Sequence, residues 1–152
     1  MLMTTLWAIV AGVAILLLLV VWRMKVAKQR RELMQHCVEA EILHDLLEPE
    51  RKVMVFDVRQ PLDVLAYSEI IPGAKRISPK EVLMNPALIP KEQDVVIYCT
   101  CPGEKTSWEI LRLAQNLQYT RLKLLHGGLE AWKAKGYAVE RYMDSFRLDS
   151  AK

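Results

Sequence analysis

The chain has 152 residues, of which 52% are hydrophobic and 26% charged, enough for one domain and an appendage but not for two full domains. Its three cysteines are an odd number, which argues against a disulfide framework. The formal charge of +3 comes from five basic residues between positions 23 and 31. Without them, 16 basic side chains stand against 18 acidic ones, a charge of −2, so no basic face is left for nucleic acid.

Residues 1–22 are predicted to form a transmembrane helix. No charged residue occurs between Leu2 and Trp22, and at about 1.5 Å per residue this stretch spans roughly 30 Å, the thickness of a bilayer's hydrocarbon core. A cleaved signal peptide is disfavoured, because no basic residue precedes the apolar run. The basic residues that follow are expected to stay in the cytoplasm and contact lipid headgroups, which leaves the N-terminus outside.

After a basic juxtamembrane linker at residues 23–37, residues 38–145 are predicted to form the soluble domain and residues 146–152 a C-terminal tail. An amphipathic helix is expected at 38–47, followed by strands at 53–58, 94–99 and, more weakly, 121–125, with an edge piece at 137–140. Helices are expected between them at 61–67, 79–84, 106–118 and 129–135. Strands that alternate with helices indicate an α/β domain, a central parallel sheet flanked by helices.

The segment from Cys99 to Ser107 joins the end of a buried strand to the start of a helix, where ligands bind in open α/β sheets. Thr106 and Glu109 have capping-box spacing, which predicts a helix N-terminus at Thr106 and backbone N–H groups that favour an anion. Together with Lys105, the positive end of this helix is expected to lower a cysteine pKa below about 8.5 and so supply a nucleophilic thiolate. From these residues alone, a purely structural role for Cys99 and Cys101 is equally well supported.

Four segments together resemble the rhodanese family over nearly all of residues 38–140. Their order and spacing carry the resemblance, more than any one of them does. The segments are Asp57-Val58-Arg59, Ile71-Pro72-Gly73-Ala74 with Ile77 beyond it, Tyr98-Cys99, and His126-Gly127-Gly128-Leu129-Glu130-Ala131-Trp132 with Gly136 to Glu140 after it.

The resemblance implies sulfur transfer through a cysteine persulfide, with a small sulfur donor such as thiosulfate or a persulfide and a thiol or other thiophilic acceptor. Cys99 is the expected nucleophile, because it directly ends the strand. The resemblance implies no metal and no organic cofactor, and it gives Asp57 and Arg59 a role in supporting the loop. The expected substrate-binding loop consists of Thr100, Pro102, Gly103, Glu104, Lys105, Thr106 and Ser107.

The chain departs from the family pattern at several positions. Ile70 stands where the family commonly has a histidine, and the loop from Cys99 to Lys105 is one residue longer than usual, as in the related Cdc25-like phosphatases. Lys105 also lacks the two-pronged fork of the arginine that is common there. Counting from Cys101 to Ser107 restores the usual length, so Cys101 is an alternative nucleophile or a resolving thiol.

The leading hypothesis is a membrane-tethered sulfurtransferase whose domain faces the cytoplasm and delivers sulfur near a membrane protein. The alternatives are a non-catalytic rhodanese-like scaffold at the membrane and a Cdc25-like phosphatase or arsenate reductase. Glu104 disfavours the phosphatase, because its charge repels a dianion. Structural roles are expected for His126, Trp132 and Cys37.

Overall fold

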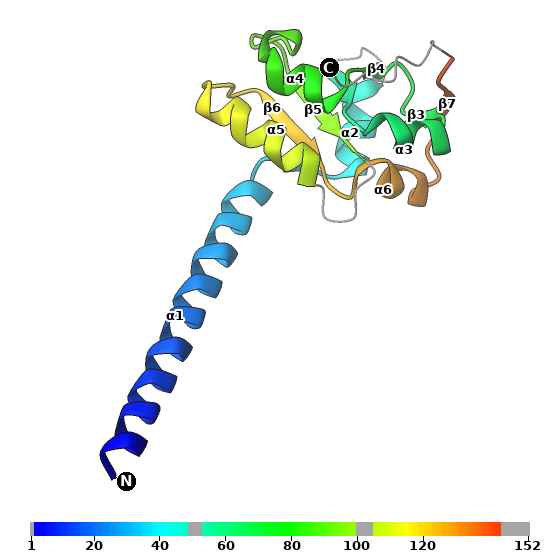
Figure 1. Cartoon of the computed structure of the whole chain (residues 1–152). Helices are drawn as coiled ribbons and strands as arrows, with labels where there is room; N and C mark the ends of the chain where they lie inside the picture. Colours follow the sequence, from blue (N-terminus) through cyan, green and yellow to red (C-terminus); the bar gives the residue numbers. More distant parts are fainter. Residues whose placement is uncertain (1, 49–52, 100–104, 144–152) are drawn as a thin grey trace. The chain divides into compact units, whose positions relative to one another are not determined.

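The computed structural model describes residues 2–48, 53–99 and 105–143, without the side chains of residues 2–10, 29, 30 and 33. The chain divides into two compact units at the boundary between Gln35 and His36. The first unit is mainly the helix α1 (Leu2–Met34), and the second is an α/β domain (Figure 1).

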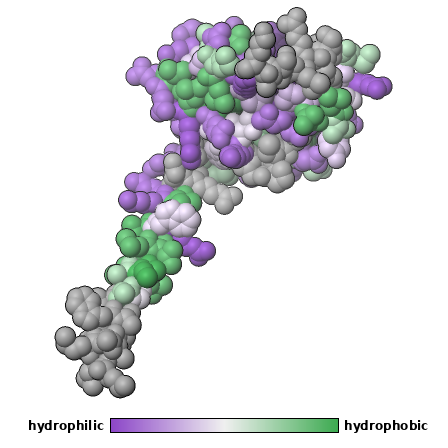
Figure 2. Space-filling model, viewed as in Figure 1, coloured by the Kyte–Doolittle hydropathy of each residue, from purple (hydrophilic) through white to green (hydrophobic). Residues whose placement is uncertain are grey.

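Helix α1 carries exposed apolar side chains followed by basic ones, seen as green and then purple along its described part in Figure 2. Among the residues whose side chains are described, no helix is both long enough and apolar enough to cross a membrane. The structure therefore does not support the transmembrane helix predicted at residues 1–22. Residues 23–34 of the predicted linker continue the same helix.

The second unit contains a parallel sheet with the strand order β1-β6-β5-β2-β4. Strands β2 (Met54–Asp57), β5 (Val95–Tyr98) and β6 (Leu122–Leu125) confirm the strands predicted from apolar runs. The start of the helix predicted at 38–47 is wrong, because β1 (Cys37–Val38) pairs with β6 and α2 begins only at Ala40. The edge strand β4 (Lys75–Arg76) was not predicted, since two residues are too few to show a strand pattern.

Helices pack on both faces of the sheet. They are α2 (Ala40–Leu47), α3 (Pro61–Ala66), α4 (Pro79–Met84), the short 3₁₀ helix η1 (Pro86–Leu88), α5 (Lys105–Asn116) and α6 (Gly128–Ala134). Val96 and Tyr98 of β5 share a core cluster with α2 and α6. Side chains alternate along a strand, so Val95 and Ile97 point to the opposite face, where α4 and α5 contact each other.

A second, two-stranded antiparallel sheet pairs β3 (Glu69–Ile70) with β7 (Glu140–Arg141). The edge piece expected at 137–140 is therefore a strand only at its last residue. A tight turn with Gly73 at a φ of 71° follows β3 and leads into β4. This turn brings the short sheet to the outer edge of the large one.

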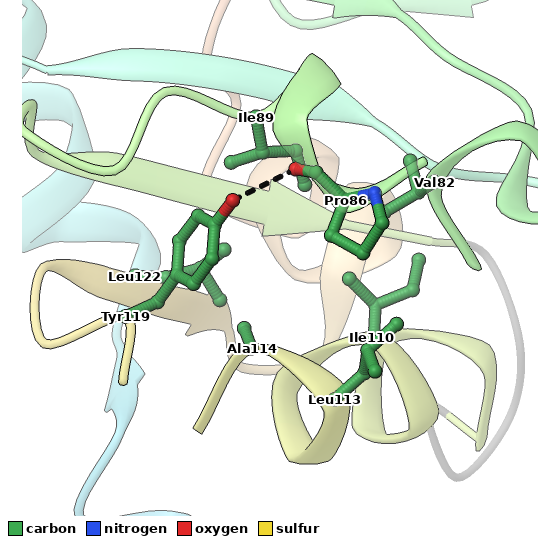
Figure 3. A pocket seen from close by; sticks show the side chains of 8 residues that line it. All are labelled: Val82, Pro86, Ile89, Ile110, Leu113, Ala114, Tyr119 and Leu122. Carbon is green, nitrogen blue, oxygen red and sulfur yellow. Dashed lines mark hydrogen bonds between the residues drawn. The ribbon is translucent and has the colours of Figure 1, made fainter. Parts of the chain in front are cut away.

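A cavity between α4, η1 and α5 is apolar and measures about 10 Å³ (Figure 3). The Tyr119 hydroxyl donates to the carbonyl of Pro86 at 2.9 Å beside it. A volume of this size holds at most about one water molecule, so the cavity is a packing gap and not a ligand site.

Candidate active site

Cys99 directly follows the central strand β5, which is paired on one side with β6 and on the other with β2. The residue is only 1% exposed, and its carbonyl accepts a hydrogen bond from the Leu129 N–H at 3.3 Å. The backbone at Cys99 is thus held between the sheet and the start of α6. This places the thiol at the carboxyl edge of a parallel sheet, where ligands bind in this class of fold.

Gly127 and Gly128 form the turn that passes against Cys99. Both have positive φ, at 70° and 56°. A Cβ atom on Gly128 would lie 1.9 Å from the Cys99 carbonyl oxygen, a distance that real Cβ atoms do not show. Both positions therefore require glycine for a positive φ, and the element that Gly128 approaches is the backbone of the expected nucleophile.

Asp57 and Arg59 form a fully buried ion pair at the end of β2. The Arg59 Nε donates to Oδ1 and Oδ2 of Asp57 at 2.9 and 2.8 Å, and Nη2 donates to Oδ2 at 2.5 Å. The other donors of Arg59 reach the carbonyls of Tyr67 at 2.9 Å and Glu69 at 2.8 Å. Since every partner lies within the domain, the pair ties β2 to the end of α3 and to β3. Its expected role in supporting the loop stays a prediction.

The Tyr98 hydroxyl joins this network from the residue just before Cys99. It accepts a hydrogen bond from the Ile71 N–H at 3.2 Å and lies against the Asp57 carboxylate. Burial, and then the negative charge of Asp57, raise the pKa of Tyr98 well above its usual range. Sequence reasoning missed this role, for which the only signal was one polar tip in an otherwise apolar strand.

Most of the predicted loop, Thr100 to Glu104, including the alternative nucleophile Cys101, lies outside the described residues. Helix α5 begins at Lys105, so the prediction that the helix starts at Thr106 is wrong by one residue, and Thr106 lies inside the first turn instead of capping it. Ser107 is fully buried in that turn, and its Oγ has no hydrogen-bond partner among the described residues. Buried hydroxyls normally have partners, so Ser107 fits a position that meets the loop or a ligand.

Structural roles were also expected for three other residues. His126 Nδ1 lies 3.1 Å from an oxygen of Glu39, and both side chains are partly exposed. Trp132 is buried in the core, as predicted, and donates to the Ala138 carbonyl at 2.8 Å. Cys37 is half-buried in β1. No group of three or more potential metal ligands occurs within the part of the chain that the structure describes.

A parallel sheet with a cysteine directly after its central strand, and a segment that leads from it into the next helix, defines an α/β domain with a candidate nucleophile at the sheet's carboxyl edge. The sequence model of the rhodanese-like domain family matches residues 39–135, and the chain belongs to this family. A sulfurtransferase from Allochromatium vinosum is 28% identical to it over 102 residues, which cover 67% of this chain and 92% of that protein.

Solved structures show the same fold. A full-length protein from Lactobacillus plantarum has a TM-score of 0.64 and 21% identity, over 78% of this chain and 98% of its own. A rhodanese-related protein from Thermoplasma volcanium has a TM-score of 0.57 and 19% identity, over 69% and 97%.

Proposed function

We propose that this protein is a sulfurtransferase that carries sulfane sulfur as a persulfide on Cys99. The observation that carries the proposal is the position of Cys99, directly after the central strand with its carbonyl held by the Leu129 N–H. A rigidly placed backbone fixes the thiolate relative to the loop that follows, and such positioning lowers the barrier to attack. The similarity to a sulfurtransferase from Allochromatium vinosum supports the same reaction class.

The chemistry has two steps. The Cys99 thiolate attacks the outer sulfur of thiosulfate, the S–S bond of thiosulfate breaks, and sulfite leaves with the bonding electron pair. An acceptor thiolate then attacks the terminal sulfur of the persulfide, which gives an acceptor persulfide and restores the Cys99 thiolate. Each step exchanges one S–S bond for another, or for an S–C bond when cyanide is the acceptor, so no external oxidant or reductant is needed.

The residues around Cys99 suit a fixed nucleophile. The buried network of Asp57, Arg59 and Tyr98 holds the strand ends beside Cys99 through hydrogen bonds to the backbone of the stretch from Tyr67 to Ile71. We propose that backbone N–H groups of residues 100–107 stabilise the charge of the transferred sulfur and that the Ser107 hydroxyl contributes a donor. The Ser107 Oγ, which has no hydrogen-bond partner among the described residues, is consistent with this role.

We further propose that the domain is tethered to a membrane, with the N-terminus outside, residues 38–145 in the cytoplasm and a membrane protein as the sulfur acceptor. This proposal rests on the sequence, in which residues 2–22 carry no charge and five basic residues follow. Fractionation of cells that express the full-length chain tests it. The wild type and Val26→Lys are expected with the membranes, whereas the double variant Leu17→Lys/Leu18→Lys is released; wild-type protein in the supernatant contradicts the tether.

The catalytic proposal is tested by cyanolysis of thiosulfate by the full-length chain, together with intact-mass detection of one added sulfur atom. The variants are Cys99→Ser, Cys101→Ser and, as a matched control, Cys37→Ser, because Cys37 lies in β1. Turnover and adduct are expected to disappear only in Cys99→Ser. Loss in Cys101→Ser alone moves the nucleophile to Cys101.

Aryl phosphate and arsenate are assayed in parallel, because the longer loop resembles that of Cdc25-like phosphatases. A wild-type protein that turns over none of the three substrates and forms no adduct after reduction is the result that favours the non-catalytic scaffold. Turnover of aryl phosphate or arsenate without thiosulfate turnover replaces the proposal with the third candidate.

A further inference from the structure

A polar hollow lies at the outer edge of the large sheet, apart from Cys99. It measures about 390 Å³ and is formed by β4, the end of β3 and the residues from Arg141 to Met143. Its wall contains Lys75 and Arg76 from the edge strand and Arg141 from β7. This volume is at the small end of the range for small-molecule sites.

The folding of the short sheet brings these cations together. The antiparallel pairing of Ile70 with Glu140 carries Arg141 and Tyr142 back to the segment that precedes β4. The Tyr142 N–H donates to the carbonyl of Ser68 at 2.6 Å, which fixes the chain on the other side of the hollow. Residues far apart in sequence are therefore held by backbone hydrogen bonds and not by chance side-chain positions.

No close ion pair within the described part of the chain neutralises these cations, although the charges of Asp57 and Glu81 act on Arg76 from further away. No carboxylate there lies within 4.0 Å of the charged nitrogens of Lys75, Arg76 or Arg141. Other cations of the domain do have such partners: Arg121 pairs with Asp94, and Lys133 with Glu69. Three clustered cations are conspicuous because the chain beyond its basic segment has a formal charge of −2.

Arg76 is held in an orientation that leaves donors available. Its Nη1 donates to the Asp57 carbonyl at 3.3 Å, while the Asp57 carboxylate is occupied by Arg59. Burial is the main reason that the pKa of Arg76 is lowered, which means that its charge lacks full solvation. An anion in the hollow would supply that missing interaction, and a guanidinium fork matches the oxygens of a phosphate.

We propose that this hollow binds a phosphate-type oxyanion carried on a small organic group, with Arg76, Arg141 and Lys75 as the cationic contacts. The apolar side chains of Ile70 and Ala74 in the same wall leave room for a short organic part. A soluble phosphate ester and the headgroup of an anionic lipid share this chemistry. The site is separate from the proposed sulfur transfer, because Cys99 does not line the hollow.

The test is titration of the full-length, isotope-labelled chain with inorganic phosphate and with glycerol phosphate, followed by NMR at constant ionic strength. Saturable shifts are expected at the amides of Lys75, Arg76, Arg141 and Tyr142. Because hydrogen bonds to charged groups are strong, Arg141→Gln is expected to weaken binding about tenfold. Arg112→Gln, which removes an exposed arginine of α5 outside the hollow, serves as the matched control and is expected to leave binding unchanged.

Vesicles of phosphatidylglycerol, compared with vesicles of phosphatidylcholine, identify the source of the ligand. Saturable binding of the soluble probes supports the proposal with a soluble phosphate ester. Preference for phosphatidylglycerol that falls in Arg141→Gln but not in Arg112→Gln supports it with a lipid headgroup. The proposal is overturned if the protein binds neither the soluble probes nor the phosphatidylglycerol vesicles, or if the two variants weaken binding equally. Neither result depends on turnover at Cys99.

Discussion

Replacement of Gly128 by alanine should damage both the stability and the chemistry of the domain. The new Cβ would lie 1.9 Å from the Cys99 carbonyl oxygen, and ordinary contact begins near 3.4 Å, so the backbone must separate by about 1.5 Å. The oxygen belongs to a main chain held by strand pairing and by the Leu129 N–H, and it cannot move as a flexible side chain does. The substitution therefore displaces Cys99 or strains the start of α6.

The expected loss in the free energy of unfolding of Gly128→Ala has two parts. A φ of 56° costs an alanine about 1–2 kcal/mol, and overpacking against a fixed backbone adds about 1–3 kcal/mol, so the total loss is about 2–5 kcal/mol. Gly136→Ala isolates the first part, because Gly136 has a φ of 75° but nothing within 4 Å of the added Cβ. The control should therefore lose only about 1–2 kcal/mol.

Urea unfolding of both variants measures the free energy of unfolding, and thiosulfate cyanolysis measures the position of the thiol. A displacement of about 1 Å at a reacting group can cost roughly 100-fold in rate, so turnover in Gly128→Ala should fall by about that factor while Gly136→Ala keeps most of it. Equal stability losses in the two variants, with turnover intact in both, would refute the close approach of Gly128 to Cys99.

Three further outcomes are expected. Arg59→Met leaves the Asp57 carboxylate buried without its partner and should cost about 3–5 kcal/mol by urea unfolding; adding Asp57→Asn should recover part of the loss, whereas Arg121→Met, at a half-exposed pair, should change little. The folded protein keeps the proton of Tyr98 to higher pH than the unfolded chain, so the contribution of Tyr98 to stability is complete below about pH 10 and is lost as the pH rises further. Tyr98→Phe should therefore make the unfolding free energy fall less steeply between about pH 9 and 11. An unchanged slope contradicts a buried phenol. Ser107→Ala should leave the unfolding free energy unchanged or raised, because the buried hydroxyl that it removes has no partner in the described part of the chain, yet it should slow formation of the sulfur adduct. An unchanged rate excludes Ser107 from the site.

The central strands could be predicted from the sequence, because they are buried along their whole length. Strands β2 and β5 are apolar runs buried on both faces, and such runs identify central parallel strands in the sequence itself. Strands β1 and β4 contain two residues each, so their existence depends on hydrogen bonds to partners distant in sequence. No pattern of neighbouring residues in the sequence indicates such strand pairing.

The same distinction applies to the candidate site. Cys99 was predictable, because its position at the end of an apolar run is a local property. The contacts of Arg59 with the carbonyls of Tyr67 and Glu69 were not, since any residue presents a carbonyl and only the path of the chain brings these two together. The cationic hollow was equally invisible, because Arg76 and Arg141 meet only through the pairing of β3 with β7.

The brevity of the two edge strands bears on how this domain behaves when crowded. An open sheet edge offers unpaired N–H and C=O groups that can capture a strand from another molecule and begin aggregation. Here β1 and β4 each expose only a two-residue edge, and β4 also carries Lys75 and Arg76. A strand from another molecule would form few hydrogen bonds at either edge. At the β4 edge, the same strand of a second copy would also be repelled by Lys75 and Arg76. The domain should consequently tolerate high local concentration without joining its sheet to that of a neighbouring copy.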